Sequence, residues 1–353
     1  MTEDAASAAT IDSPAPGGSF RGRAAAAALG AISWLAGRLP ERPLVGIAEV
    51  VGELWYRLAP KRAAQARRNL RRVAEWALAE TAGSAGLHRA ATDDRALERL
   101  VRSSFRHAAR YYLEVARIPS ITPDYIRERV HIETPDVIDA AFDPGGAVIF
   151  VAPHFGSVEL PGLYLSVRSG RMAVAPMETL ADPALQGYFA RTRGSVGIRI
   201  VGLRAARREL LAALRRGDPV GLVADRDLTG GGIDVSLFGS PAPMPAGPAL
   251  LAIESGAPIF ATSVRRIGVG QYAGRLQAVP VPTVGTRRER VIATLTAEIE
   301  AFQRDIVLAP DQWWAIFFPI WPDLEAGSAA TSAASAGATA SGPVASPGPG
   351  SPS

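Results

Sequence analysis

The segment AVIFVAPHFGSVE, residues 147–159, decides how the rest of the chain is interpreted. Its first half, residues 147–152, is a short apolar run, as expected of a strand buried on both faces of a parallel sheet. The run ends at Pro153 and His154, and Gly156 then precedes a stretch with helical spacing. The segment therefore predicts a strand, a loop that carries His154, and a helix.

Short apolar runs alternate with helical patterns through the rest of the chain. We expect strands over residues 147–152, 172–176, 198–201, 219–224 and 259–264. We expect helices over residues 159–168, 183–195, 205–216, 246–254 and 288–309. This alternation predicts an α/β fold with a mostly parallel mixed sheet flanked by helices. Because such sheets bind ligands at the carboxyl ends of their strands, polar residues that follow a strand are candidates for the site.

The chain before residue 147 is helical by pattern. Residues 21–60 carry broad apolar faces interrupted by arginines, and Pro40 and Pro43 divide them into two helices, which we expect to form a hairpin. Residues 94–117 have the spacing of a further helix. Aromatic rings beside arginines suit a membrane interface, so we predict membrane docking by the first pair; the alternative is packing on the main domain.

Residues 61–76, KRAAQARRNLRRVAEW, predict a basic amphipathic helix. Its arginines are expected to meet an anionic membrane surface, and the alternative is a solvated face. No recognisable nucleic-acid-binding motif accompanies this patch, so we expect no nucleic-acid partner. The residues concerned are Lys61, Arg62, Arg67, Arg68, Arg71 and Arg72.

Composition excludes several classes of chemistry. The chain has no cysteine, which excludes a disulfide framework, a thiolate nucleophile and a cysteine zinc site. The longest charge-free apolar stretch, residues 24–37, is shorter than the roughly 20 residues that span a bilayer. We therefore expect a peripheral protein. Residues 1–19 and 324–353 are low in complexity and expected to be disordered, which leaves one domain over residues 20–323, with 20–76 as its membrane-associating part.

His154 has the properties of a general base. A neutral imidazole accepts a proton near neutral pH, and a carboxylate on its other nitrogen fixes the tautomer. Glu159 lies five residues later, at the start of the expected helix, and is our candidate for that carboxylate. The alternatives are a packing histidine and a glutamate that caps the helix. The other histidines, at positions 88, 107 and 131, do not follow a strand.

Five ordered segments resemble one enzyme family. His154 and Glu159 match the H-x4-(D/E) motif of the lysophospholipid acyltransferase superfamily, and HFGSVE is similar to the H-x-G-N-W-(D/E) form of its bacterial branch. That branch includes the lipid A late acyltransferases and the actinobacterial phosphatidylinositol mannoside acyltransferases. The chain departs from the pattern at Ser157-Val158, where Asn-Trp is usual. The further similar segments are Arg193–Gly197, Asp225–Leu228 with Phe238-Gly239, Met244–Pro248 and Pro310–Trp314.

The resemblance covers roughly residues 45–322 and looks strongest to the phosphatidylinositol mannoside acyltransferases. It implies transfer of a long acyl chain, typically palmitoyl, from acyl-CoA to a mannose 6-hydroxyl at the cytoplasmic face of the inner membrane. It implies no metal and no cofactor beyond acyl-CoA as co-substrate, and an oxyanion held by backbone amides or a nearby cation. A lipid A-type acceptor is the close alternative, and a non-catalytic lipid-binding protein is a remote one.

Five further residues are candidates for substrate binding. Asp225, Arg226 and Asp227 follow a strand; they suggest the DxD site of a glycosyltransferase, an Asp–Arg network, or, by the resemblance, another carboxylate for His154. Glu178 also follows a strand and is expected to bind acceptor hydroxyls or pair with Arg193. Arg193 is a candidate for a phosphate of CoA or of the acceptor. No G-x-S-x-G, G-x-G-x-x-G or Walker pattern occurs, which disfavours a serine hydrolase and a nucleotide cofactor.

Overall fold

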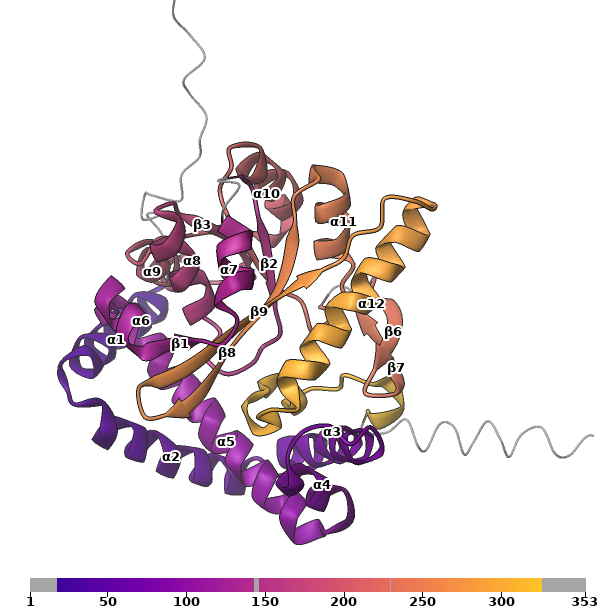
Figure 1. Ribbon diagram of the computed structural model, residues 1–353. Coiled ribbons are helices and arrows are strands. Elements are labelled where there is room, and N and C mark those ends of the chain that lie inside the picture. The colour runs from indigo at the N-terminus through magenta and orange to yellow at the C-terminus, as the bar shows by residue number, and fades with distance from the viewer. Residues whose placement is uncertain (1–17, 143–145, 229, 326–353) are drawn as a thin grey trace, which may run out of the picture.

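The computed structural model describes residues 18–142, 146–228 and 230–325 and has a seven-stranded sheet at its centre (Figure 1). The strand order is β1-β9-β8-β2-β5-β3-β4, in which β8, β2, β5, β3 and β4 run parallel while β9 and β1 run the opposite way. The strands are β1 Val130–Ile132, β2 Ile149–Ala152, β3 Ala173–Met177, β4 Ile198–Gly202, β5 Val220–Val223, β8 Ile259–Gly268 and β9 Gln271–Val279. A separate hairpin pairs β6 Ile233–Leu237 with β7 Ser240–Met244.

Helices cover both faces of the sheet because the buried strands alternate their side chains between two cores. Ile149 and Val151 join the large core that includes α10, α11 and α12, whereas Phe150 faces the smaller core under α7 and α8. The later helices are α6 Pro123–Arg129, α7 Pro135–Phe142, α8 Leu160–Ser169, α9 Pro183–Gly194, α10 Ala206–Arg215, α11 Gly247–Ser255 and α12 Arg287–Ile306. The predicted α/β class with a mostly parallel mixed sheet is confirmed.

The N-terminal helices surround α5, which supports one end of the sheet (Figure 1). α2 packs closely on α5 at Gly52, where a Cβ atom would lie 2.6 Å from the Cα atom of Arg106. The predicted break at Pro40 is confirmed, but α1 and α2 follow one another along α5 instead of folding back as a hairpin. These helices are α1 Phe20–Arg38, α2 Glu41–Leu58, α3 Pro60–Ala79, α4 Ala85–Thr92 and α5 Asp94–Arg117.

The arginines on the basic face of α3 are largely engaged within the protein. Arg67 and Arg71 form ion pairs with carboxylates of α5, Arg72 pairs with Asp323, and Arg68 donates to the carbonyl oxygen of Leu324 at 2.9 Å. Three of these cations are therefore neutralised by carboxylates of the protein itself, and contact of this face with an anionic membrane surface stays a prediction. Exposed apolar side chains gather instead on α1 and α2: Ile32, Trp34, Leu35, Ile47, Val50, Val51, Leu54 and Leu58.

No helix in the described ranges combines the length and apolarity that a bilayer crossing requires. The two expected low-complexity segments, 1–19 and 324–353, lie almost wholly outside the described residues. Ser19 is described and caps α1, because its hydroxyl accepts from the amide of Gly22 at 2.9 Å. The strands β1 and β9 and the β6–β7 hairpin were missed by the sequence analysis.

Candidate active site

His154 and Asp225 form a hydrogen-bonded pair at the carboxyl end of the parallel strands. Nδ1 of His154 lies 2.5 Å from Oδ1 of Asp225, and the backbone amide of His154 donates to Oδ2 at 2.8 Å. Burial alone would raise the pKa of Asp225, but the nearby His154, together with hydrogen bonds from His154 and Trp313, lowers it below its usual value. Asp225 is thus a carboxylate that accepts from Nδ1–H, which leaves Nε2 of His154 able to take a proton.

Sheet register explains why Asp225 occupies this position. β2 and β5 are parallel neighbours, and Ala152, the last residue of β2, pairs with Val223, the last residue of β5. His154 and Asp225 each lie two residues beyond those paired ends. Two loops leaving adjacent parallel strands at the same level bring these side chains together.

Glu159 does not contact His154, so the prediction that its carboxylate orients the imidazole does not fit this geometry. It occupies the cap position of α8 without a side-chain capping bond, and forms a bidentate ion pair with Arg193 of α9, at 2.5 and 3.1 Å. Both side chains are largely buried. Burial lowers the pKa of the Arg193 guanidinium, but Glu159 more than offsets this and raises it. The pair ties the start of α8 to the end of α9, and Arg193 therefore does not pair with Glu178.

The loop that carries His154 is fixed by the segment Pro310–Trp314. The amide of Trp314 donates to the carbonyl oxygen of His154 at 3.0 Å, and the indole N–H of Trp313 donates to Oδ2 of Asp225 at 2.7 Å. The Trp314 ring packs edge-on against the imidazole, with 4.7 Å between centroids. Both tryptophans lie in one of the five segments that carry the resemblance, but nothing in the local pattern predicted that they contact the pair.

Gly156 allows the loop to approach β8 closely. Its φ is +58°, and a Cβ atom there would lie 2.0 Å from the carbonyl oxygen of Val264. The amides of residues 154–157 all donate to protein acceptors: Oδ2 of Asp225 and the carbonyl oxygens of Pro153, Gln312 and Val264. These four amides are therefore committed to the fold, and the expectation that backbone amides hold an oxyanion does not apply to them.

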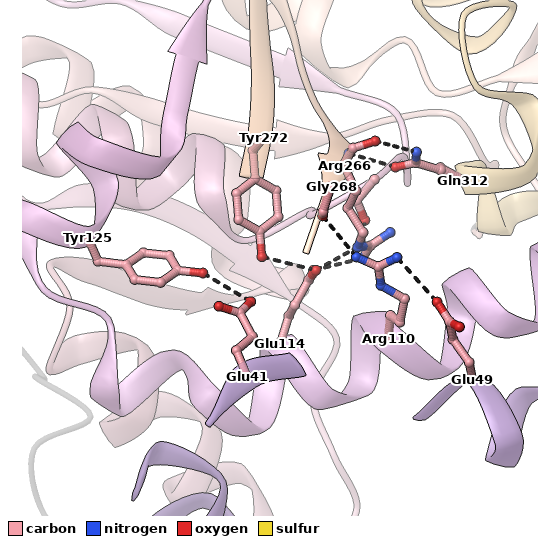
Figure 2. Close-up of polar contacts among 10 residues, drawn as sticks. Glu41, Glu49, Arg110, Glu114, Tyr125, Arg266, Gly268, Tyr272 and Gln312 are labelled. Carbon is pink, nitrogen blue, oxygen red and sulfur yellow. Dashed lines mark hydrogen bonds and ion pairs between the residues drawn. The ribbon is translucent and has the colours of Figure 1, made fainter. Parts of the chain in front are cut away.

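A buried ion pair between Arg266 and Glu114 (Figure 2) supports the loop. Arg266 of β8 donates to both carboxylate oxygens of Glu114 of α5, at 2.6 and 2.7 Å, and to the carbonyl oxygen of Gly156 at 2.9 Å. The side chain of Gln312 forms bonds of 2.8 and 2.9 Å with the backbone of Arg266. Nothing in the sequence singled out Arg266 or Glu114, because they lie 152 positions apart.

His107, a further histidine close to this network, cannot serve as the base. Burial and the nearby cations, first of all Arg266, lower the pKa of His107 to about 3. It is therefore neutral at cellular pH and would stay unprotonated during proton transfer. Its Nε2 atom lies 3.6 Å from Oδ2 of Asp311, within the segment that fixes the loop.

The other candidate residues of the sequence contact different partners and do not form one site. Asp227 accepts from the amides of Gly230 and Gly232 at 3.0 and 2.7 Å, and so shapes its own loop. Arg226 lies over the ring of Phe318, with its guanidinium carbon 3.6 Å from the centroid. The two carboxylates of the DxD sequence thus serve different partners, and no group of three or more metal-ligating side chains occurs among the described residues. Glu178 is exposed just after β3.

Comparison with known proteins identifies one family of similar enzymes. Residues 86–318 match the family described as bacterial lipid A biosynthesis acyltransferase. The chain is 32% identical over 218 residues to the phosphatidylinositol mannoside acyltransferase of Mycolicibacterium smegmatis, covering 61% of this chain and 70% of that protein. It is 31% identical over 221 residues to the phosphatidylinositol mannoside acyltransferase of Mycobacterium tuberculosis H37Rv, covering 61% of this chain and 68% of that protein.

Proposed function

The chain belongs to the bacterial lipid A biosynthesis acyltransferase family, and we propose that it moves a long acyl group from acyl-CoA to a mannose 6-hydroxyl of phosphatidylinositol mannoside. The observation that carries the proposal is the hydrogen-bonded pair of His154 and Asp225 at the carboxyl end of the parallel strands. The choice of acceptor is supported by similarity to the mycobacterial enzymes.

The mechanism is a direct transfer with the acceptor hydroxyl as nucleophile. Nε2 of His154 removes the hydroxyl proton as the oxygen attacks the thioester carbonyl, and Asp225 stabilises the imidazolium that forms. The carbon–sulfur bond then breaks, and the CoA thiolate takes the proton from the imidazolium. The balance is one ester and one thiol formed from one alcohol and one thioester.

The apolar surface of α1 and α2 supports peripheral docking on the membrane that holds the acceptor. Trp34, Val50 and Leu58 are among its exposed side chains, and Arg38 lies 4.0 Å from the centroid of the Trp34 ring. Apolar side chains flanked by an arginine and an indole ring are typical of helices that lie in the membrane interface. α2 packs on α5, which also carries Glu114, so this surface is connected through α5 and Arg266 to the loop of His154.

The test is a reaction of the purified protein with palmitoyl-CoA and phosphatidylinositol mannosides in vesicles. Release of CoA thiol and mass spectrometry of the lipids are followed together, with the His154→Ala variant as control. A gain of one palmitoyl group on the mannolipid, absent with the variant, is the expected result. CoA release with acylation only of a lipid A-type precursor would replace the proposed acceptor, and full activity of His154→Ala would remove the mechanism.

A further inference from the structure

Two arginines without a carboxylate partner contact the same aromatic ring beside the active site. Arg226 lies 3.6 Å and Arg62 5.2 Å from the centroid of Phe318, measured from each guanidinium carbon. The described part of the chain offers neither guanidinium a hydrogen bond or an ion pair. Phe318 packs on Trp314 at 5.6 Å between centroids, and Trp314 packs on His154. Two aromatic rings, those of Phe318 and Trp314, therefore connect the two cations to the base.

Other arginines of α3 differ from Arg62 in this respect. On the same helix, α3, Arg67, Arg71 and Arg72 are each neutralised by a carboxylate of the protein. Arg62, in the first turn of α3, is not, and no side chain caps this helix start, where the helix dipole adds positive potential. The chain thus leaves positive charge uncompensated at this point.

The two guanidinium groups also repel each other. Burial of Arg226 lowers its pKa, the carboxylates of Asp225 and Glu178 act against this, and the charge of Arg62 lowers it further. Asp225 is already bound by His154 and Trp313, so it does not neutralise Arg226 by direct contact. Holding two cations near one ring costs free energy, and an anion between them would recover it.

We infer that Arg62 and Arg226 form a binding site for a phosphate group of a bound substrate, with Phe318 holding both guanidinium planes in place. Guanidinium groups match phosphate oxygens in bidentate geometry, and stacking on a ring fixes their orientation. The inference rests on the proposed acyl transfer, in which both substrates carry phosphate: acyl-CoA in its nucleotide part, and the acceptor in its phosphoinositol diester.

The test measures steady-state kinetics of Arg62→Gln and Arg226→Gln with each substrate varied in turn. Loss of one charge-assisted contact is expected to raise the KM of the phosphate-bearing partner on the order of tenfold. The kcat should stay within about twofold, because the contact is made equally in ground and transition states. Arg208→Gln, which removes one charge from the exposed face of α10, is the matched control and should leave both constants unchanged.

Substrates that lack phosphate identify the source of the anion. If the site holds CoA, the effect of Arg226→Gln disappears with palmitoyl-pantetheine as donor and persists with every acceptor. If the site holds the acceptor, the rise in KM caused by Arg226→Gln persists with palmitoyl-pantetheine as donor. It disappears when methyl mannoside, which has no phosphate, replaces the lipid acceptor. Either pattern supports the site; a KM effect that is the same with and without phosphate, or no KM effect from either variant, overturns it.

Binding measurements separate failure of this site from failure of the proposed function. Calorimetric titration with CoA alone measures binding without any turnover. If the wild-type enzyme acylates a different phosphate-bearing lipid, the same kinetic comparison of the variants is made with that lipid. Melting temperatures are recorded for each variant. If Arg226→Gln does not fold, exposed Arg62 carries the test, since its replacement removes no buried contact.

Discussion

Replacing Glu114 by Ala is expected to leave Arg266 as an uncompensated buried cation. The side chain of Arg266 is 1% exposed, and both of its ion-pair bonds go to Glu114. Removing one partner of such a pair lowers the free energy of unfolding by about 3–5 kcal/mol. At about 2–4 °C per kcal/mol for a chain of this size, the melting temperature should fall by roughly 10 °C.

A double replacement separates stability from function. In Glu114→Leu with Arg266→Met both charges are gone, and apolar side chains of similar volume are often neutral or stabilising in place of a buried pair. The carbonyl oxygen of Gly156 still loses its donor, so the loop that carries His154 is held less firmly. A misplacement of about 1 Å lowers turnover roughly 10²-fold. We therefore expect a stable protein with a much lower kcat.

The assay combines thermal unfolding with steady-state kinetics for the single and double variants. Recovery of the melting temperature together with a wild-type kcat would show that Arg266 serves stability alone. A double variant as unstable as Glu114→Ala would refute the assignment of the penalty to an unpaired charge.

Three further results are expected. Asp225→Asn should lower kcat about 10⁴-fold with little loss of stability, because an amide N–H facing Nδ1 favours the tautomer whose Nε2 is protonated; a loss below tenfold would contradict this. Gly156→Ala should abolish activity and lower the melting temperature, whereas Gly170→Ala, also at positive φ but with open space around its Cβ, should cause only the milder backbone strain. Glu298 is fully buried, neither oxygen has a partner in the described chain, and burial raises its pKa well above 4.5. The folded state thus holds a proton that the unfolded state releases above pH 4.5, so stability falls as pH rises toward the folded pKa. Glu298→Met should remove that dependence. Measured by urea unfolding, its free energy of unfolding relative to the wild type should rise by up to about 1.4 kcal/mol per pH unit between pH 4.5 and the folded-state pKa. A gain in unfolding free energy that does not depend on pH would contradict the reasoning.

Local sequence pattern was sufficient for the elements that build the parallel half of the sheet. The apolar runs near β2, β3, β4 and β5 are short, bounded and followed by helical spacing, so each strand was placed within a few residues. β9 was missed because its sequence, QYAGRLQAV, mixes polar and small residues; it is stabilised by antiparallel pairing with β8. Pairing with a neighbouring strand is not encoded in the strand's own periodicity.

Chemical identity at the site was predictable, but pairing was not. His154 followed a strand, and so did Asp225, and both were candidates from the sequence alone. Choosing between Glu159 and Asp225 required knowledge that β2 and β5 are neighbours in the sheet, because His154 and Asp225 are 71 positions apart in the sequence. Nearness in sequence favoured Glu159, but a helix that starts after the loop directs this residue toward α9, where Arg193 neutralises it.

The arginines of α3 also have partners that the local sequence does not reveal. A run of arginines looks like a lipid-binding face only if no carboxylates lie opposite it, and those of α3 meet Glu98, Asp94 and Asp323 from distant parts of the chain. An ion pair on a protein surface contributes little to stability, yet it removes the unbalanced charge that would attract an anionic headgroup. Membrane contact should therefore depend on apolar side chains of α2 such as Val50 and Leu54. Replacing these two by Ser should weaken sedimentation with vesicles more than replacing Arg67 and Arg71 by Gln. The reverse order would restore the basic face as the docking surface.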